Sequence, residues 1–204
     1  MKMDCTNTFT FETYFNHIQR LLIENKATGG DQSLEHIEAT KINVQRIKRI
    51  NKTGKIHDSI QSVIKANQPD WSWTLIVESW CGDAAQIIPY IYKASECADS
   101  IDLKIILRDE NPEIIDQFLT NNGRAIPILI CRDGRTNEVI GHWGPRPKNI
   151  IKWIVDYKAE NTDFEPATFN KDLHLFYARD KGKGINEAIR SSVEEWLKRT
   201  KRLI

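Results

Sequence analysis

Apolar residues recur at helical spacing along the first third of the chain. The pattern predicts an amphipathic helix over residues 8–27, which ends before Gly29-Gly30, and a second helix that begins after Ser33. A third helix is predicted from about Ile56, and the polar run at residues 67–70, which contains a proline, ends it. The second helix is expected to turn four apolar side chains toward the core: Leu34, Ile37, Val44 and Ile47.

Strands and helices are predicted to alternate through the central part of the chain. Residues 73–79 have the pattern of a strand, and the run Leu75-Ile76-Val77 within it is apolar on both faces. Such a run is typical of a central strand with helices on each side. A helix is predicted from Asp83 to about Ala98, followed by an alternating strand from Ile101 to Leu107.

Turn signals divide the next segment. Asn111-Pro112 is a favourable helix start, and Asn122-Gly123 is a plausible helix end. Residues 126–131 and 139–143 then read as two strands of a hairpin around residues 132–135.

The last part of the chain is predicted to be helical. One helix follows Gly144-Pro145, and two more follow Phe164-Glu-Pro166, with a break at Gly182-Lys-Gly184. The apolar faces of these amphipathic helices must be buried, either against the same body or against a second subunit. The residues that define the three helices are Ile150, Ile151, Ile154 and Val155; Leu173, Phe176 and Tyr177; and Ile189, Val193, Trp196 and Leu197.

The junction between the central strand and its following helix carries a single cysteine, Cys81. Helix N-terminal amides and the positive end of the helix dipole point at this position, which favours the thiolate. Ionised Asp83 and Glu78 nearby would oppose that effect by repulsion. The sequence leaves the sign of the net pKa shift open.

Three features place this junction in a family context. Trp80-Cys81-Gly82 lies between a strand and a helix, Pro89 falls eight residues beyond the cysteine, and Ile126-Pro127 follows downstream. In this order they resemble the thioredoxin family, in which the proline within the helix produces a kink and a cis-proline faces the cysteine. The resemblance implies an α/β, thioredoxin-like fold, with a central mixed sheet flanked by helices.

We expect three regions on this basis. Residues 55–160 would form the thioredoxin-like domain, residues 1–54 an N-terminal helical extension, and residues 161–204 a C-terminal helical extension packed on the same body.

The sequence also departs from the thioredoxin pattern. The position of the second cysteine is Ala84, that of the motif's proline is Asp83, and that of the buried acid six residues before the first cysteine is Leu75. Exchange between two cysteines of one motif is therefore impossible.

The resemblance leads to a monothiol hypothesis for Cys81. The thiol would attack a protein disulfide or a low-molecular-weight disulfide, and an external thiol would resolve the product. Cys97 lies about 24 Å along the same helix and Cys131 about 13 Å from Pro127, so both are interpreted as core cysteines. Cys5 precedes the first helix and stays open as a resolving thiol.

Neighbouring residues receive roles in this hypothesis. Asp83 would carry a proton to the leaving thiolate. Trp80 and Gly82 would form the substrate-facing turn, with Trp80 either docking a partner or simply packing. Ile126 beside Pro127 would offer its backbone to an extended peptide.

Two alternatives remain open. Ala84, Leu75 and the helical additions also suit a redox-inactive binding or assembly module on a thioredoxin fold. A glutaredoxin-like protein with a glutathione-ligated iron–sulfur cluster is disfavoured by Asp83-Ala84.

Composition narrows the remaining classes. With 29 basic and 28 acidic residues, the net charge of +1 gives no electrostatic case for nucleic acid or an anionic membrane. No apolar stretch is long enough to cross a membrane, no signal sequence is evident, and the cysteines and histidines lack metal-ligand spacing. We therefore expect a cytoplasmic protein without a metal or cofactor.

A basic cluster is interpreted as a solvated helix face, with an acidic protein partner as the alternative: Lys41, Arg46, Lys48, Arg49, Lys52 and Lys55.

Overall fold

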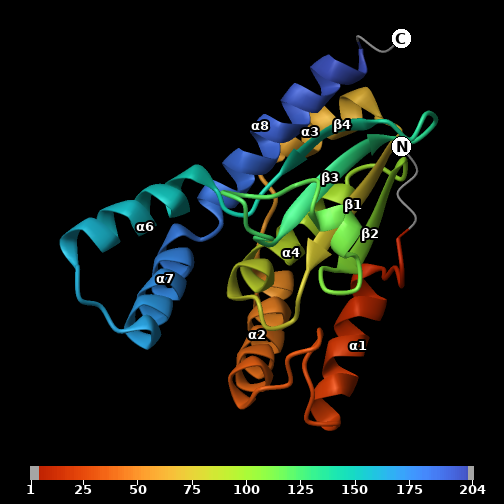
Figure 1. Cartoon of the computed structure of the whole chain (residues 1–204). Coiled ribbons are helices and arrows are strands. Elements are labelled where there is room, and N and C mark those ends of the chain that lie inside the picture. Colours follow the sequence, from red (N-terminus) through yellow and green to blue (C-terminus); the bar gives the residue numbers. More distant parts are fainter. Residues whose placement is uncertain (1–4, 202–204) are drawn as a thin grey trace.

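The computed structural model describes residues 5–201, and its centre is a mixed four-stranded sheet (Figure 1). The strands are β1 (Trp71–Val77), β2 (Ile101–Leu107), β3 (Ile128–Asp133) and β4 (Val139–Trp143), in the order β2-β1-β3-β4. β1 pairs parallel with β2 and antiparallel with β3, which pairs antiparallel with β4. The predicted mixed sheet flanked by helices is confirmed.

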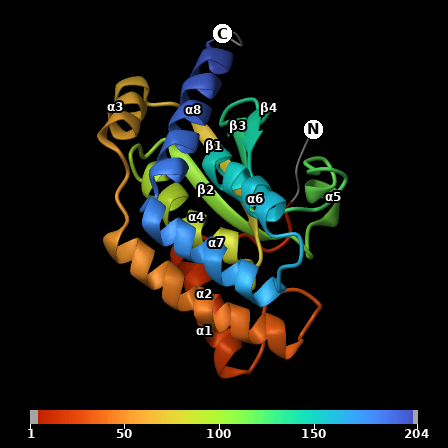
Figure 2. The ribbon, with the colours of Figure 1, turned by 90° about the vertical axis from the view of Figure 1, so that its left-hand side faces the viewer.

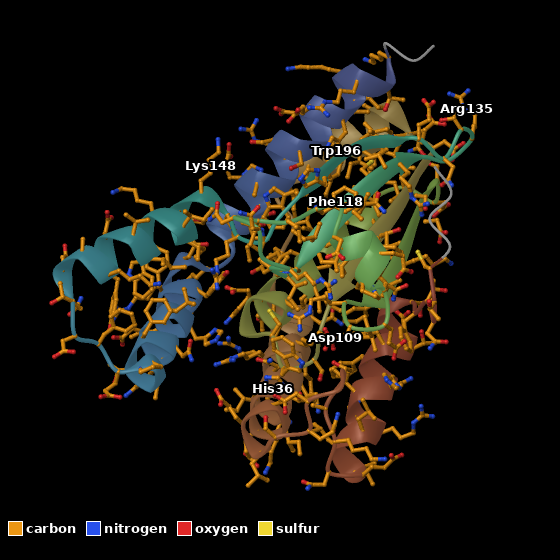
Figure 3. All side chains as sticks on the ribbon, viewed as in Figure 1. His36, Asp109, Phe118, Arg135, Lys148 and Trp196 are labelled. Carbon is orange, nitrogen blue, oxygen red and sulfur yellow. The ribbon has the colours of Figure 1, made fainter. Side chains whose placement is uncertain are left out.

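β1 is an inner strand of this sheet, as its apolar pattern predicts. Leu75, Ile76 and Val77 are all fully buried, although their side chains alternate between the two faces. Trp71 and Trp73 lie on one face and meet Trp196 edge-on, with ring centroids 6.0 Å apart in each pair. Trp196 reaches the sheet from a C-terminal helix (Figure 3).

Three helices precede the sheet in sequence. α1 (Phe11–Ile23) contacts α2 (Leu34–Thr53) and strand β2, whereas α3 (Asp58–Asn67) packs against the last helix of the chain. In α2, Ile37, Val44 and Ile47 are buried as predicted. Leu34 was expected inside, but its side chain is 75% exposed, because it is the first residue of the helix and lies beyond the packed part.

The helix after β1 positions the candidate site. α4 (Gly82–Ser95) contains Pro89 and packs against α2, β2 and the last helix. Its first residues directly follow Cys81, so the end of a central strand and the start of a buried helix meet there. This agrees with the strand-to-helix junction that the sequence predicts.

The helix predicted from Asn111 to Asn122 is much shorter in the structure. α5 covers only Pro112–Ile115. The Asn111 side chain does not cap it, since its amide donates to the carbonyls of Leu107 and Thr6 and its oxygen accepts from the Thr6 amide. Asn121 and Asn122 both adopt positive φ, which is incompatible with helix continuation.

The C-terminal helices contribute to the same body. α6 (Lys148–Glu160) and α7 (Pro166–Asp180) form a hairpin that extends to one side, and α8 (Lys183–Thr200) returns along β4 (Figure 1). Gly182, at φ +79°, separates α7 from α8. In a second view, α7 lies in front of α4, and α2 runs below it with α1 behind (Figure 2). This arrangement brings α7 to the start of α4.

Candidate functional site

Cys81 lies at the N-cap of α4, where the sequence predicts it. Its Sγ accepts a hydrogen bond from the Ala84 amide at 3.5 Å, and its carbonyl oxygen accepts from the Ala85 amide at 3.1 Å. The residue is only 9% exposed. The sulfur therefore replaces the oxygen that usually caps a helix.

The peptide bond between Ile126 and Pro127 is cis, and it faces Cys81. The Cys81 thiol donates to the Ile126 carbonyl oxygen, with Sγ and oxygen 3.5 Å apart. Gly144 packs behind this turn at φ +140°, and a Cβ there would lie 2.2 Å from the Pro127 oxygen. Position 144 thus requires glycine, which the sequence-based interpretation explained only as a strand break.

Asp83 is nearly buried at the first turn of α4, and both its carboxylate oxygens are engaged. Arg146 donates from Nε to Oδ2 at 2.8 Å, and its second nitrogen lies 2.6 Å from the same oxygen. Tyr177 donates its hydroxyl hydrogen to Oδ1 at 2.7 Å. Arg146, after β4, therefore supplies the counter-charge of the carboxylate, and α7 supplies a neutral hydrogen-bond donor.

Gly82 is covered by α7 as well. A Cβ on Gly82 would lie 2.5 Å from His174 Nε2, so only a glycine allows this close approach. His174 Nδ1 lies 3.2 Å from the Gln86 amide nitrogen, one turn further along α4. The C-terminal helix thus lies directly on the turn that follows Cys81.

A comparison with protein-family models identifies the family to which this chain belongs. A model described as thioredoxin matches residues 29–162, well over half of the chain. The chain belongs to the thioredoxin family. A search of curated proteins returned no match.

Two solved structures that resemble this chain in fold have low sequence identity to it. A protein of unknown function from Pseudomonas aeruginosa is 15% identical, with a TM-score of 0.54, and the match covers 92% of this chain and 96% of that one. An HIV epitope scaffold is 14% identical, with a TM-score of 0.50 and coverage of 87% and 96%. At this identity the likeness shows the fold alone.

Within the thioredoxin fold of this chain, the thiol of Cys81 is held in its neutral form. Burial raises its pKa to about 12, and the negative charge of Asp83 acts in the same direction. The amides of Ala84 and Asp83 and the charge of Arg146 oppose the shift without reversing it. Desolvation therefore outweighs the helix terminus, which answers the question that the sequence left open.

Glu78 makes a second buried acidic centre next to the family motif. Its backbone carbonyl accepts from the Cys81 amide at 3.1 Å, whereas its carboxylate accepts from the Thr28 hydroxyl and, at 2.9 Å, from the Asp109 amide. Burial raises the pKa of Glu78. Its neighbours come from the loop after α1 and the loop after β2, so the side chain ties both loops to the end of β1.

Trp80 is half-buried, and two side chains lie against its indole ring. The His36 ring stacks on it with centroids 4.4 Å apart, and the Arg108 guanidinium lies 4.8 Å from the ring centroid. His36 reaches the site from the N-terminal part of α2 (Figure 3).

Two of the other cysteines, Cys131 and Cys97, lie away from the motif. Cys131 is fully buried in β3 and Cys97 partly buried just after α4, and both are free thiols. Cys5 packs against the core beside Thr6. Within residues 5–201 no group of three potential ligands forms a metal site, and no described helix has the length and apolar character needed to cross a membrane.

Sequence reasoning missed four contributors to the site: Arg146, His174, Tyr177 and Gln86. The first comes from the turn after β4, two come from α7, and the last from α4. No local motif marks them. The proximity of Arg146 to the Gly144-Pro145 strand break was the one available signal.

Proposed function

We propose that this thioredoxin-family protein performs monothiol thiol–disulfide exchange through Cys81, with an external thiol as the resolving partner. The observation that carries the proposal is the placement of Sγ, 3.5 Å from both the Ala84 amide and the Ile126 carbonyl oxygen beside Pro127. A sulfur between a helix N-terminus and an extended backbone segment is positioned for attack on a disulfide presented along that segment.

The proposed reaction has two balanced steps. The Cys81 thiolate attacks one sulfur of a protein disulfide or a low-molecular-weight disulfide, so that a mixed disulfide forms and the second sulfur leaves as a thiolate. An external thiolate then attacks the substrate sulfur of the mixed disulfide and releases the Cys81 thiolate. No net electrons are gained or lost by the protein over the cycle.

Asp83 has the role of proton carrier in this scheme. Its carboxylate takes the proton that Cys81 loses and returns it to the leaving thiolate. The carboxylate is held by Arg146 and Tyr177, so this transfer requires that one of these hydrogen bonds loosen. Trp80, Gly82, Ile126 and Pro127 form the surface against which the substrate lies.

The burial of Cys81 predicts a low rate of thiol–disulfide exchange. With a pKa of about 12, roughly one Cys81 in 10⁵ is a thiolate at pH 7. We therefore propose slow exchange unless a substrate or a movement of α7 exposes the sulfur to water. The proposed setting is the reducing cytoplasm, where external thiols are abundant.

A redox-inactive binding or assembly module is the second candidate. The burial and high pKa of Cys81 favour it, as does Ala84, which removes the second thiol of the motif. In that case the same backbone segment beside Pro127 would bind a peptide, and no disulfide exchange would follow.

One experiment separates the two candidates. A variant that keeps Cys81 but carries Cys5→Ser, Cys97→Ser and Cys131→Ala is incubated, folded, with oxidised glutathione, and intact mass reports adducts. Exchange predicts one glutathione adduct that a reducing thiol removes, and none when Cys81→Ser is added. Failure of folded protein to form the adduct over a day at pH 8, while unfolded protein forms it, would reject exchange in favour of binding.

A further inference from the structure

A cavity of about 400 Å³ lies apart from the Cys81 sulfur, where α2, α4 and the α7–α8 junction meet. Figure 2 shows the C-terminal end of α2 close to this junction. Three cationic side chains line the cavity: Arg49 near the end of α2, Lys55 just after it, and Lys181 at the end of α7. A cavity of this size is in the range of small-molecule sites.

These three cations lack counter-charges. Across residues 5–201, none of the three side chains forms an ion pair or a hydrogen bond with another described residue. All three belong to exposed residues, yet they converge on one cavity from separate elements. The chain as a whole has a net charge of only +1, so this concentration of positive charge is local.

The floor of the cavity supplies a neutral donor. Tyr90 on α4 is 6% exposed, and within the described part of the chain its hydroxyl has no hydrogen-bond partner. Two glycines approach its ring: a Cβ on Gly54 would lie 3.1 Å from Tyr90 Cζ, and one on Gly182 would lie 2.2 Å from its oxygen. The absence of side chains at both positions lets the tyrosine ring and its hydroxyl pack closely against the two glycine backbones.

Two further charged groups act on residues of the cavity, and neither is among its lining residues. Asp180 is the carboxylate that acts on Tyr90, but its oxygens accept hydrogen bonds from Asn149 Nδ2 at 2.9 Å and from the Gly184 amide at 3.0 Å. Arg46, one turn before Arg49 on α2, adds a further positive charge, and its pKa is lowered by burial and by Arg49. Arg46 and Arg49 thus repel each other beside the cavity.

We propose that this cavity binds a small polyanion, with at least two negative charges on phosphate or carboxylate groups, between Arg49, Lys55, Lys181 and the Tyr90 hydroxyl. Guanidinium and ammonium groups form charge-assisted hydrogen bonds with such anions, and a bound negative charge would offset the repulsion between Arg46 and Arg49. For Arg49 and Lys55, the proposal adds a ligand to a cluster that the sequence analysis interprets as a solvated helix face.

The test is titration calorimetry of the full chain with inorganic pyrophosphate and, separately, with citrate, at constant ionic strength. Saturable binding near one equivalent is expected for at least one of them, and their relative affinity distinguishes phosphate from carboxylate as the recognised group. Arg49→Gln and Lys181→Gln should each weaken binding roughly tenfold or more, through loss of a charge-assisted hydrogen bond. Tyr90→Phe should weaken it less.

Lys48→Gln is the matched control, because it removes the same charge from the same helix without lining the cavity. Equal weakening by Lys48→Gln and Arg49→Gln would show a diffuse charge effect and overturn the proposal. Absence of saturable binding by both anions would overturn it too. Because the mutated cations are exposed and unpaired with described residues, unchanged melting of the variants is expected to confirm that they fold.

Discussion

Tyr177 on α7 donates its hydroxyl hydrogen to Asp83 Oδ1 on α4, with the two oxygens 2.7 Å apart. The bond joins residues 94 positions apart and connects the C-terminal extension to the turn of the thioredoxin motif. Both residues are buried, so the bond has little competition from water. Burial and the Asp83 charge raise the pKa of Tyr177, which keeps the hydroxyl protonated as the donor.

Tyr177→Phe should therefore destabilise the protein. The substitution leaves Asp83 Oδ1 buried without this donor, and the expected loss is about 1–3 kcal/mol in the free energy of unfolding. Urea denaturation measures it. Tyr92→Phe is the control, because the Tyr92 hydroxyl donates to Glu12 at 2.9 Å in an exposed pair and its loss should cost less than 1 kcal/mol. Equal costs for the two variants would contradict a special role for the buried bond.

The reactivity of Cys81 should depend on Asp83. Burial raises the Cys81 pKa first and Asp83 raises it further, so Asp83→Asn should lower that pKa while Arg146 stays nearby. We expect alkylation of Cys81 by iodoacetamide at pH 8 to accelerate roughly tenfold, which corresponds to about one pKa unit. Asp102→Asn, an exposed substitution on β2, should leave the rate unchanged.

The pH profile of the same reaction provides an internal check. With a pKa of about 12, the rate for the protein without the Asp83 change should still rise tenfold per pH unit between pH 8 and 10. A plateau beginning near pH 8.5, the ordinary thiol value, would show that the reagent reaches Cys81 only after the site has opened.

Some residues of the site are placed by local sequence patterns, whereas others reach it from distant parts of the chain. Cys81 at a helix start and Ile126-Pro127 at a strand start are local patterns, so their positions in the fold follow from short stretches of sequence. Arg146, His174 and Tyr177 meet α4 from 63, 88 and 94 residues away. The helical spacing of α7 predicts an apolar face but not which surface that face covers, and Arg146 lies in a turn outside any helix.

The sheet illustrates the same limit. Its strands were predictable because alternation and turn residues are encoded nearby, and the family resemblance supplied the topology. The short α5 was not predictable, because Asn111 looks like a helix cap in isolation. Its amide instead binds Thr6 and Leu107, and Thr6 is 105 residues away, a contact that no local pattern reveals.

Gly82 is expected to tolerate no side chain while His174 is present. A Cβ there would lie 2.5 Å from His174 Nε2, so Gly82→Ala should cost about 1–3 kcal/mol through overpacking. In a His174→Ala background the space is free, and the same substitution should be nearly neutral, which a double-mutant cycle measures. Gly30→Ala, which meets nothing within 4 Å, is the control. An equal cost of Gly82→Ala in both backgrounds would refute the contact.

His174 should make stability depend on pH. Burial first, and then the charge of Arg46, lower its pKa to about 4 from an ordinary 6.5. Between these values the unfolded chain binds a proton that the folded chain excludes, so the free energy of unfolding falls as pH drops from 7 toward 4, by up to about 3 kcal/mol. Urea denaturation at pH 7 and pH 4.5 should show a smaller loss of unfolding free energy for His174→Gln, which removes the titrating ring beside Gln86.

The matched control is His57→Asn, which removes an exposed imidazole but keeps a side chain that can cap α3. Between the two pH values this variant should lose as much stability as the original protein. If His174→Gln and His57→Asn lost the same amount, the buried histidine would not be the group responsible.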